Sequence, residues 1–105
     1  MEENKIQEMQ FLEQNLQQVL MQKQAFQMEL TETQSALKEI EDSGEEVFKI
    51  VGQLMIKTKK DKVKEELSNK EKILDLRSKT IEKQEKSLTE QLEKLREEFM
   101  KAQKK

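Results

Sequence analysis

The sequence contains no histidine, no cysteine and no proline, and only two of its 105 residues are glycine. Without His and Cys, a histidine-based catalytic triad cannot form, and the commonest zinc ligands are missing. The two glycines, Gly44 and Gly52, stand apart, so no glycine-rich loop can cradle a phosphate. The lack of cysteine also excludes a disulfide framework. We therefore expect no enzyme activity, no metal and no cofactor.

Aromatic residues and net charge are also scarce: Phe, four times, is the only aromatic residue, and the formal net charge is −2. Such a chain has no general attraction for nucleic acid or anionic lipid, and its isolated Phe residues form no stacking platform for single strands. The longest apolar stretch is far short of the roughly 20 residues that span a bilayer. The acidic start, Met1-Glu2-Glu3-Asn4, does not resemble a signal peptide. We expect a cytoplasmic protein that binds neither nucleic acid nor membrane.

The sequence is rich in charged residues, which make up 40% of it, against 33% hydrophobic residues. This balance is typical of long helices that form a coiled coil. Apolar residues follow alternating steps of three and four at Met9, Leu12, Leu16, Val19, Phe26, Leu30, Leu37 and Ile40. Lys23 and Thr33 occupy the two remaining core positions of this heptad pattern. The pattern predicts a helix over about residues 2–43, ended by Gly44 in the left-handed conformation.

A second helix is predicted over about residues 59–103. Its start is indicated by Thr58 and Asp61, which have the spacing of a capping box. A column of apolar residues recurs every seven places: Leu67, Leu74, Ile81, Leu88 and Leu95, continued by Ala102. Its companion column, three residues after each, is mostly polar: Lys70, Arg77, Gln84, Gln91 and Glu98. Two helices of similar length, each on the order of 60 Å, suit an antiparallel pair.

Between the helices, residues 46–58 have a strand pattern with crowded apolar residues: Val47, Phe48, Ile50, Val51, Leu54, Met55 and Ile56. Gly52-Gln53 fits a two-residue hairpin turn in which Gly takes a positive φ. That turn places Val51 opposite Leu54, Lys49 opposite Ile56 and Val47 opposite Thr58. Phe48, Ile50, Met55 and Lys57 lie on the other face. Both faces of the hairpin are therefore substantially apolar.

This hairpin needs something to cover it. A lone hairpin is marginal in water, and two helices leaving one end cannot cover both of its faces. Its open edges also invite pairing with other strands. We therefore interpret it as an assembly element that pairs with hairpins of other subunits. One alternative is a hairpin folded onto its own helices; another is a structural coiled-coil tether or scaffold, for which a short polar turn would have been enough.

Several stretches of the chain are similar to one known family: Val47-Phe48-Lys49-Ile50-Val51-Gly52, Leu54-Met55-Ile56-Lys57, Gln22-Lys23-Gln24, Glu66-Leu67 and Ile81-Glu82-Lys83-Gln84-Glu85. In these stretches the chain resembles a prefoldin subunit of the β class, found in archaea and, in related form, in eukaryotes. One hairpin, and not two, points to the β class. The departure is Gln53, where relatives often have Pro.

The resemblance implies a mainly α fold: one domain over residues 1–105, in which two long helices form an antiparallel coiled coil joined by one β-hairpin. It implies a hetero-hexamer of two α-class and four β-class subunits assembled through the hairpins. It further implies an ATP-independent chaperone that holds unfolded polypeptides at the coiled-coil tips and delivers them to a group II chaperonin.

The sequence adds a prediction about these tips, where the two chain ends lie side by side in an antiparallel pair. Off-seam apolar residues gather in the first half of helix one, and in helix two the apolar set widens only near its end. We expect client binding at the tip by Ile6, Met9, Phe11, Leu12, Leu92, Leu95, Phe99 and Met100. Soft Met and flat Phe side chains adapt to varied apolar partners. The alternative is that these residues only tighten a fraying helix end.

Overall fold

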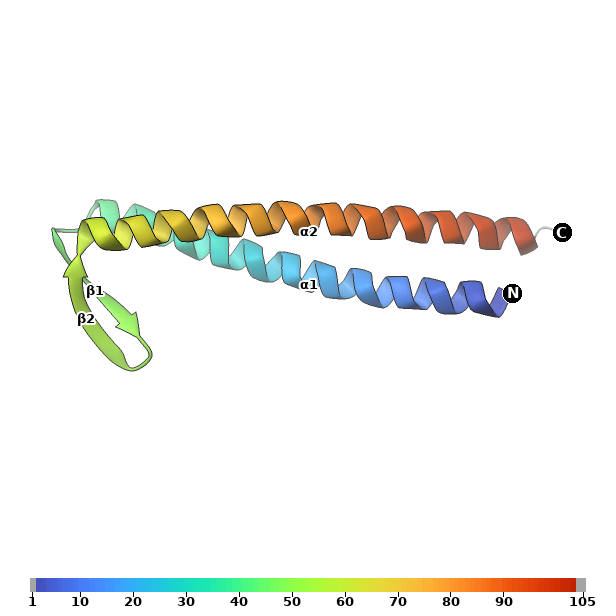
Figure 1. Cartoon of the computed structure of the whole chain (residues 1–105), viewed down its shortest axis with the longest axis horizontal. Coiled ribbons are helices and arrows are strands. Elements are labelled where there is room, and N and C mark those ends of the chain that lie inside the picture. The colour runs from blue at the N-terminus through green and yellow to red at the C-terminus, as the bar shows by residue number, and fades with distance from the viewer. Residues whose placement is uncertain (1, 104–105) are drawn as a thin grey trace. The chain divides into compact units, whose positions relative to one another are not determined.

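The computed structural model describes residues 2–103 and contains two helices and two strands. Helix α1 spans Glu2–Glu41, strand β1 Glu46–Val51, strand β2 Leu54–Lys59 and helix α2 Lys60–Gln103 (Figure 1). The predicted fold class, two long antiparallel helices joined by one β-hairpin, is confirmed.

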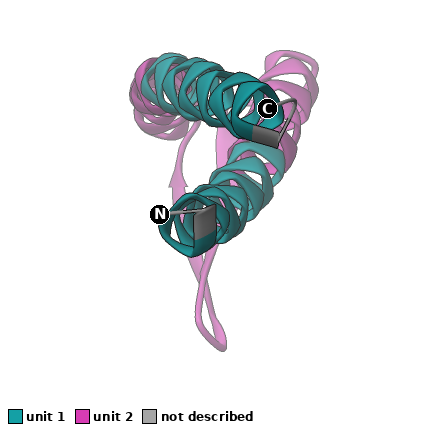
Figure 2. Ribbon diagram, turned by 90° about the vertical axis from the view of Figure 1, so that its right-hand side faces the viewer, with its two compact units in different colours: residues 1–25, 78–105 teal, residues 26–77 magenta. Residues whose placement is uncertain are grey.

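The chain divides into two compact units, coloured in Figure 2. Unit 1 takes in the chain up to Ala25 together with the chain from Ser78 onward, and unit 2 is Phe26–Arg77. In each unit a stretch of α1 lies beside a stretch of α2 that runs in the opposite direction. Unit 2 also contains the hairpin.

The core of each unit is the seam between its two helix stretches. All ten predicted seam positions of α1 are buried or half-buried, so the heptad reading of this helix is confirmed. In unit 1 the most buried apolar residues are Ile81 and Leu92; in unit 2 they are Ile40 and Leu74. Thr33 is also buried in unit 2, where its hydroxyl donates a hydrogen bond to the Glu29 carbonyl oxygen at 2.8 Å. This bond satisfies a polar group that would otherwise be costly to bury.

Ion pairs join the two helix stretches of unit 1. Lys23 Nζ lies 2.9 Å from Glu85 Oε2, and Arg96 Nη2 lies 3.0 Å from Glu13 Oε1. Lys23 is the charged seam residue of α1, and the hydrogen bond from Lys23 to Glu85 raises the pKa of the lysine. A single polar pair in a seam favours the register that keeps its partners together.

The predicted companion column of α2 is wrong. Lys70, Arg77, Gln84, Gln91 and Glu98 are all exposed. The second column instead lies four residues after each Leu or Ile of the first: Glu71, Ser78, Glu85, Leu92 and Phe99, all buried or half-buried. Positions i+3 and i+4 both lie on the same helix face, so periodicity does not separate them. Packing selects i+4, because this choice brings Leu92 and Phe99 into the seam and leaves Lys70, Arg77 and Glu98 in water. Ala102, expected to continue the first column, is exposed.

The predicted helix ends also need correction. Gly44 does not take a positive φ; within residues 2–103 only Gly52 does. The last carbonyls of α1 are bonded differently: the Ser43 hydroxyl donates to the Ile40 carbonyl at 2.7 Å, and Lys60 Nζ donates to the Glu41 carbonyl at 2.9 Å. The Ser43 hydroxyl and the Lys60 ammonium thus bond two carbonyls at the helix end without a left-handed glycine.

Thr58 is not the cap of α2. It lies in β2, paired with Val47, and the helix begins two residues later at Lys60. The backbone N–H of Lys60 donates to the Glu45 carbonyl at 3.0 Å, which joins the base of the hairpin to the start of the helix. Pairing with β1 therefore takes precedence over the local capping signal. Asp61 remains in the first turn, where a carboxylate is favourable to the helix dipole.

Candidate functional site

The hairpin of unit 2 has the predicted register. Val51 pairs with Leu54, Lys49 with Ile56, and Val47 with Thr58. Gly52 has φ of 62° and no non-glycine residue in the described chain has a positive φ, so only the first turn residue is left-handed. This is the pattern of a Gly-X turn, whose twist matches that of the strands. The sheet within residues 2–103 has only these two strands, so the outer edges of both are open.

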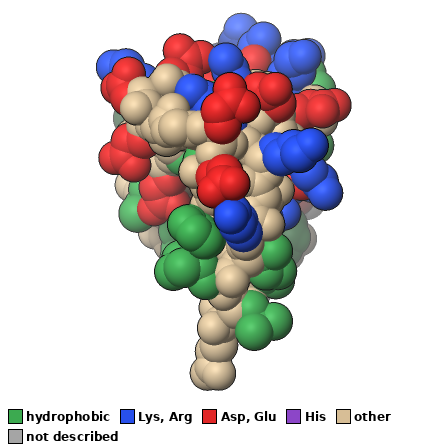
Figure 3. All heavy atoms as spheres, turned by 90° about the vertical axis from the view of Figure 1, so that its left-hand side faces the viewer, with side chains coloured by type: hydrophobic (Ala, Val, Ile, Leu, Met, Phe, Trp, Pro, Cys, Tyr) green, Lys and Arg blue, Asp and Glu red, His purple; other side chains and the backbone are tan. Residues whose placement is uncertain are grey.

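The apolar side chains of the hairpin are exposed on both faces. Ile50 is 71% exposed and Phe48 62%, and four more large apolar residues are exposed beside them: Val51, Leu54, Met55 and Ile56. Figure 3 shows hydrophobic side chains on both sides of the hairpin. Val47, near its base, is half-buried. Covering six such side chains would yield on the order of 10 kcal/mol, as an upper bound. This hairpin surface is defined by the eight predicted residues, Val47, Phe48, Ile50, Val51, Gly52, Leu54, Met55 and Ile56.

Ion pairs within unit 2 join the hairpin to α2 and α2 to the end of α1. Lys49 Nζ, on β1, lies 2.7 Å from Glu66 Oε2 on α2. Lys64 Nζ lies 2.9 Å from Glu41 Oε1, which ties α2 to the end of α1. The hydrogen bonds from these lysines lower the pKa of Glu66 and of Glu41 below the usual range of a glutamate. Lys49, which interrupts the apolar run, therefore forms an ion pair with α2 of the same chain.

The eight predicted tip residues of unit 1 fall into three groups. Ile6, Phe11 and Met100 are exposed, Phe11 to 64%. Met9, Leu12, Leu95 and Phe99 are half-buried in or beside the seam. Leu92 is only 4% exposed. The prediction that Leu92 offers an apolar surface is therefore corrected: it is a core residue, because the second column of α2 runs through it.

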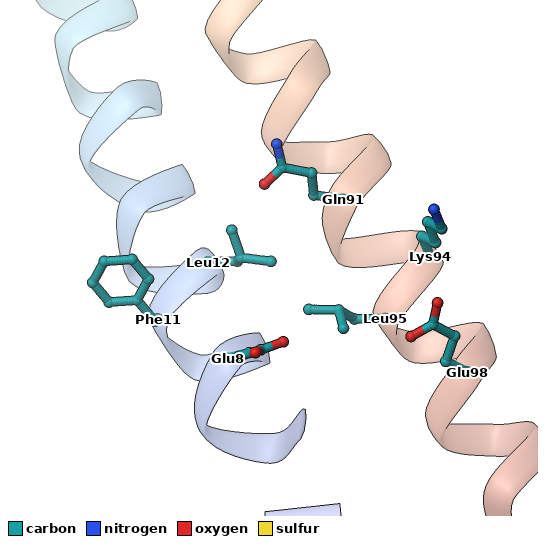
Figure 4. A pocket seen from close by; sticks show the side chains of 7 residues that line it. All are labelled: Glu8, Phe11, Leu12, Gln91, Lys94, Leu95 and Glu98. Atoms are coloured by element: carbon teal, nitrogen blue, oxygen red, sulfur yellow. The ribbon is translucent and has the colours of Figure 1, made fainter. Parts of the chain in front are cut away.

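Leu12 and Leu95 point toward each other from the two helices, with Phe11 on the flank of α1 (Figure 4). They line a hollow of about 410 Å³, the tip hollow, whose other lining residues are Glu8, Gln91, Lys94 and Glu98. This hollow combines an apolar floor with a charged rim. It is suited to hold an apolar side chain.

Sequence reasoning missed two exposed apolar residues of α2 in unit 2. Ile73 and Leu76 are 50% and 64% exposed, so the apolar set of helix two does not widen only near its end. The signal was present: in the run Ile73-Leu74-Asp75-Leu76 only Leu74 belongs to the column of seven.

The described part of the chain offers little for other chemistry. Nowhere in residues 2–103 do three metal-binding side chains gather as a metal site requires. Within the same residues, neither helix has the length of apolar sequence that a membrane crossing needs.

Comparison with known proteins identifies the family. The profile of the prefoldin subunit family matches residues 3–105. The prefoldin subunit beta of Thermococcus onnurineus is 48% identical over 67 residues, which cover 62% of this chain and 58% of that protein. The prefoldin subunit beta of Sulfurisphaera tokodaii is 39% identical over 74 residues, 69% of this chain and 59% of that protein. These matches span less than three-fifths of the curated relatives.

A solved structure is similar over almost the whole chain. The crystal structure of the prefoldin beta subunit from Thermococcus strain KS-1 superposes with a TM-score of 0.88 at 40% sequence identity. The match covers 96% of this chain and 90% of that one. The chain therefore belongs to the prefoldin subunit family, as a member of its β class.

Proposed function

We propose that this chain is a subunit of an ATP-independent chaperone that captures unfolded polypeptides and delivers them to a group II chaperonin. The observation that carries the proposal is a hairpin with both faces apolar and exposed, in a chain of the prefoldin family. Such a surface is unfavourable in water, and its contact with a partner would be favourable. We further propose a cytoplasmic location.

The hairpin surface supports assembly with other subunits. Its open strand edges can pair with strands of a neighbour, and its two faces can pack against further hairpins. Exposure of Phe48 and Ile50 argues against a hairpin folded onto its own helices. The proposed assembly is a hetero-hexamer of two α-class and four β-class subunits.

The ends of the helices in unit 1 support client binding. Ile6, Phe11 and Met100 are exposed, and Phe11 lines the tip hollow together with Leu12 and Leu95. Phe and Met side chains adapt to varied apolar partners. Each contact contributes about 1–3 kcal/mol, and several subunits acting on one client add strength through multivalency. We assign the client contact to these residues and to the half-buried Met9 and Phe99, and not to Leu92.

The test has two parts. The mass of the purified chain in solution should increase on mixing with an α-class prefoldin subunit, to the value of a hexamer. The mixture should then suppress aggregation of a chemically unfolded protein equally well with and without ATP. A chain that stays monomeric in the mixture, or an assembly that gives no protection, contradicts the proposal.

A further inference from the structure

Unit 1 contains a second hollow, of about 390 Å³. Five uncharged polar residues line it: Asn15, Gln18 and Gln22 from α1, and Gln84 and Ser87 from α2. Val19 and Leu88 supply its apolar part. Among the described residues that line it, none carries a charge, although 40% of the chain is charged. The tip hollow differs, since Glu8, Lys94 and Glu98 stand at its rim.

The two hollows are repeats of one groove. Lining positions of the tip hollow recur seven residues away in the second: Phe11 and Gln18, Leu12 and Val19, Lys94 and Ser87, Leu95 and Leu88. Seven residues are two turns of a coiled-coil helix, so the paired positions share a face. The hollows therefore lie on the same side of the helix pair, about 10 Å apart along it. An extended chain covers that distance with about three residues.

The lining of the second hollow fits a polypeptide backbone. A side-chain amide both donates and accepts hydrogen bonds, as a peptide group does. In folded proteins, helices included, nearly all buried peptide groups are already paired, whereas an extended non-native segment offers its own freely. Charged side chains at this place would lose hydration beneath a bound chain, which is costly. An uncharged, amide-lined groove avoids this cost.

We propose that this charge-free second hollow binds the backbone of an extended, uncharged segment of a non-native polypeptide. Gln18, Gln22 and Gln84 hydrogen-bond to its peptide groups, while an apolar side chain of the same segment enters the tip hollow. The inference rests on the proposed chaperone function and deepens it. Which polypeptides the chain binds then depends on the unpaired peptide groups of their backbone as well as on their apolar side chains.

A matched pair of variants tests the role of the amides. Gln18→Glu with Gln22→Glu places two carboxylates, which accept but cannot donate, in the groove. Gln17→Glu with Gln24→Glu adds the same charge to the same stretch of α1 at exposed positions that line neither hollow. The probe is an end-blocked, uncharged heptapeptide of Val, Thr and Leu, titrated into the isotope-labelled chain and followed by NMR.

We expect the groove variant to bind the peptide about three- to tenfold more weakly than the wild type, and the control variant to stay within about twofold. In the wild type, the side-chain amide signals of Asn15, Gln18 and Gln22 should shift on titration, and those of Gln17 and Gln24 should not. Equal binding by both variants overturns the inference. Equal melting temperatures of the two variants exclude a folding effect.

A second probe tests the backbone directly. The same peptide with methyl groups on alternate backbone nitrogens keeps its side chains but loses donors, and should bind at least about threefold more weakly. Undiminished binding of the methylated peptide overturns the inference, as does tighter binding of a cross-linked helical peptide. These results leave the proposed function intact as long as the wild-type assembly protects an unfolded protein from aggregation; absence of that protection is the separate failure of the proposed function.

Discussion

Ser78 is a polar residue in the second seam column of α2. Its Oγ atom is buried, and among residues 2–103 no hydrogen-bond partner lies within reach. Thr33, the buried hydroxyl of unit 2, differs because it donates to the Glu29 carbonyl oxygen. A buried polar atom without a partner costs about 1–3 kcal/mol.

Replacing Ser78 with Ala should therefore raise the free energy of unfolding by about 1–2 kcal/mol, since it removes the unpaired hydroxyl and improves helix propensity. Chemical denaturation followed by circular dichroism measures the change. Ser35→Ala is the control, because Ser35 is exposed on α1 and reports the propensity gain alone. An equal gain in both variants would show that the Ser78 hydroxyl is not penalised in the folded chain.

The ion pairs of Glu66 and Glu41 lead us to expect a small pH dependence of stability in unit 2. Hydrogen bonds from Lys49 and Lys64, respectively, lower their pKa values below the ordinary 4.5. A group whose pKa is lowered by folding stabilises the folded state above its unfolded pKa, and this stabilisation is lost as pH falls through the folded pKa. Both pairs are exposed, so each contributes little.

We expect the melting temperature of the chain to fall as pH is lowered below about 4.5. The double variant Glu41→Gln with Glu66→Gln should be slightly less stable than the wild type at pH 7, and the difference should shrink in acid. Thermal melts at several pH values in low salt measure this. If the difference stays constant down to pH 2, these ion pairs are not its source.

At the scale of elements, the hairpin differs from both helices. Each helix buries its apolar seam against the other, but six large apolar residues of the hairpin remain exposed. The hairpin is therefore not needed to bury the helix core. It contributes an exposed apolar surface, which a partner would stabilise by covering it.

Replacing Phe48, Ile50 and Ile56 with Ser should abolish assembly with little loss of helix signal. All three side chains are exposed, so the isolated chain loses little packing. Analytical ultracentrifugation gives the mass and circular dichroism the helix content. Met21→Ser with Met28→Ser, two exposed apolar residues of α1, is the control and should assemble normally. An oligomer that persists after all three hairpin changes would rule out the assembly role.

At the scale of the whole molecule, the proposed function requires two separate surfaces, one for assembly and one for client binding. The hairpin surface belongs to unit 2 and the tip residues to unit 1. Because the two sets share no residue, assembly and capture should be separable by mutation.

Changing Ile6, Phe11 and Met100 to Ser should weaken capture of an unfolded protein and leave assembly intact. Each lost contact removes about 1–3 kcal/mol at most, and multivalency makes the loss steep when every β-class subunit is altered. Light scattering of an aggregating client, measured beside the oligomer mass, separates the two effects. If these residues only tighten the helix ends, the melting temperature falls and capture stays normal.

Leu92→Ser gives a useful contrast. Leu92 is buried in the seam of unit 1, so this change should destabilise the helix pair by about 2–4 kcal/mol. We expect its main effect to be a lowered melting temperature, whereas the changes at exposed tip residues mainly weaken capture. A Leu92 variant of wild-type stability would contradict its place in the core.

The sequence by itself determined the main features of the fold. The seam of α1 follows from its steps of three and four, because only one helix face can collect those residues. The hairpin register follows from Gly52, since a two-residue turn with a positive φ at its first position leaves one pairing of the strands. The exposed apolar faces of the hairpin follow from that register.

The tertiary structure decided three features that the local sequence pattern left open: the second seam column of α2, the start of α2 and the bonding at the end of α1. Positions i+3 and i+4 share a helix face, so the contact with α1, and not the period, brought Leu92 and Phe99 into the seam and kept Gln84 and Gln91 at its edge. Strand pairing drew Thr58 into β2, and Lys60, distant in sequence, bonded the last carbonyl of α1, that of Glu41. The charge-free groove depends on the same choice of column, because it is lined from both helices at once. Such features arise between segments far apart in the chain, where a repeat within one segment carries no information.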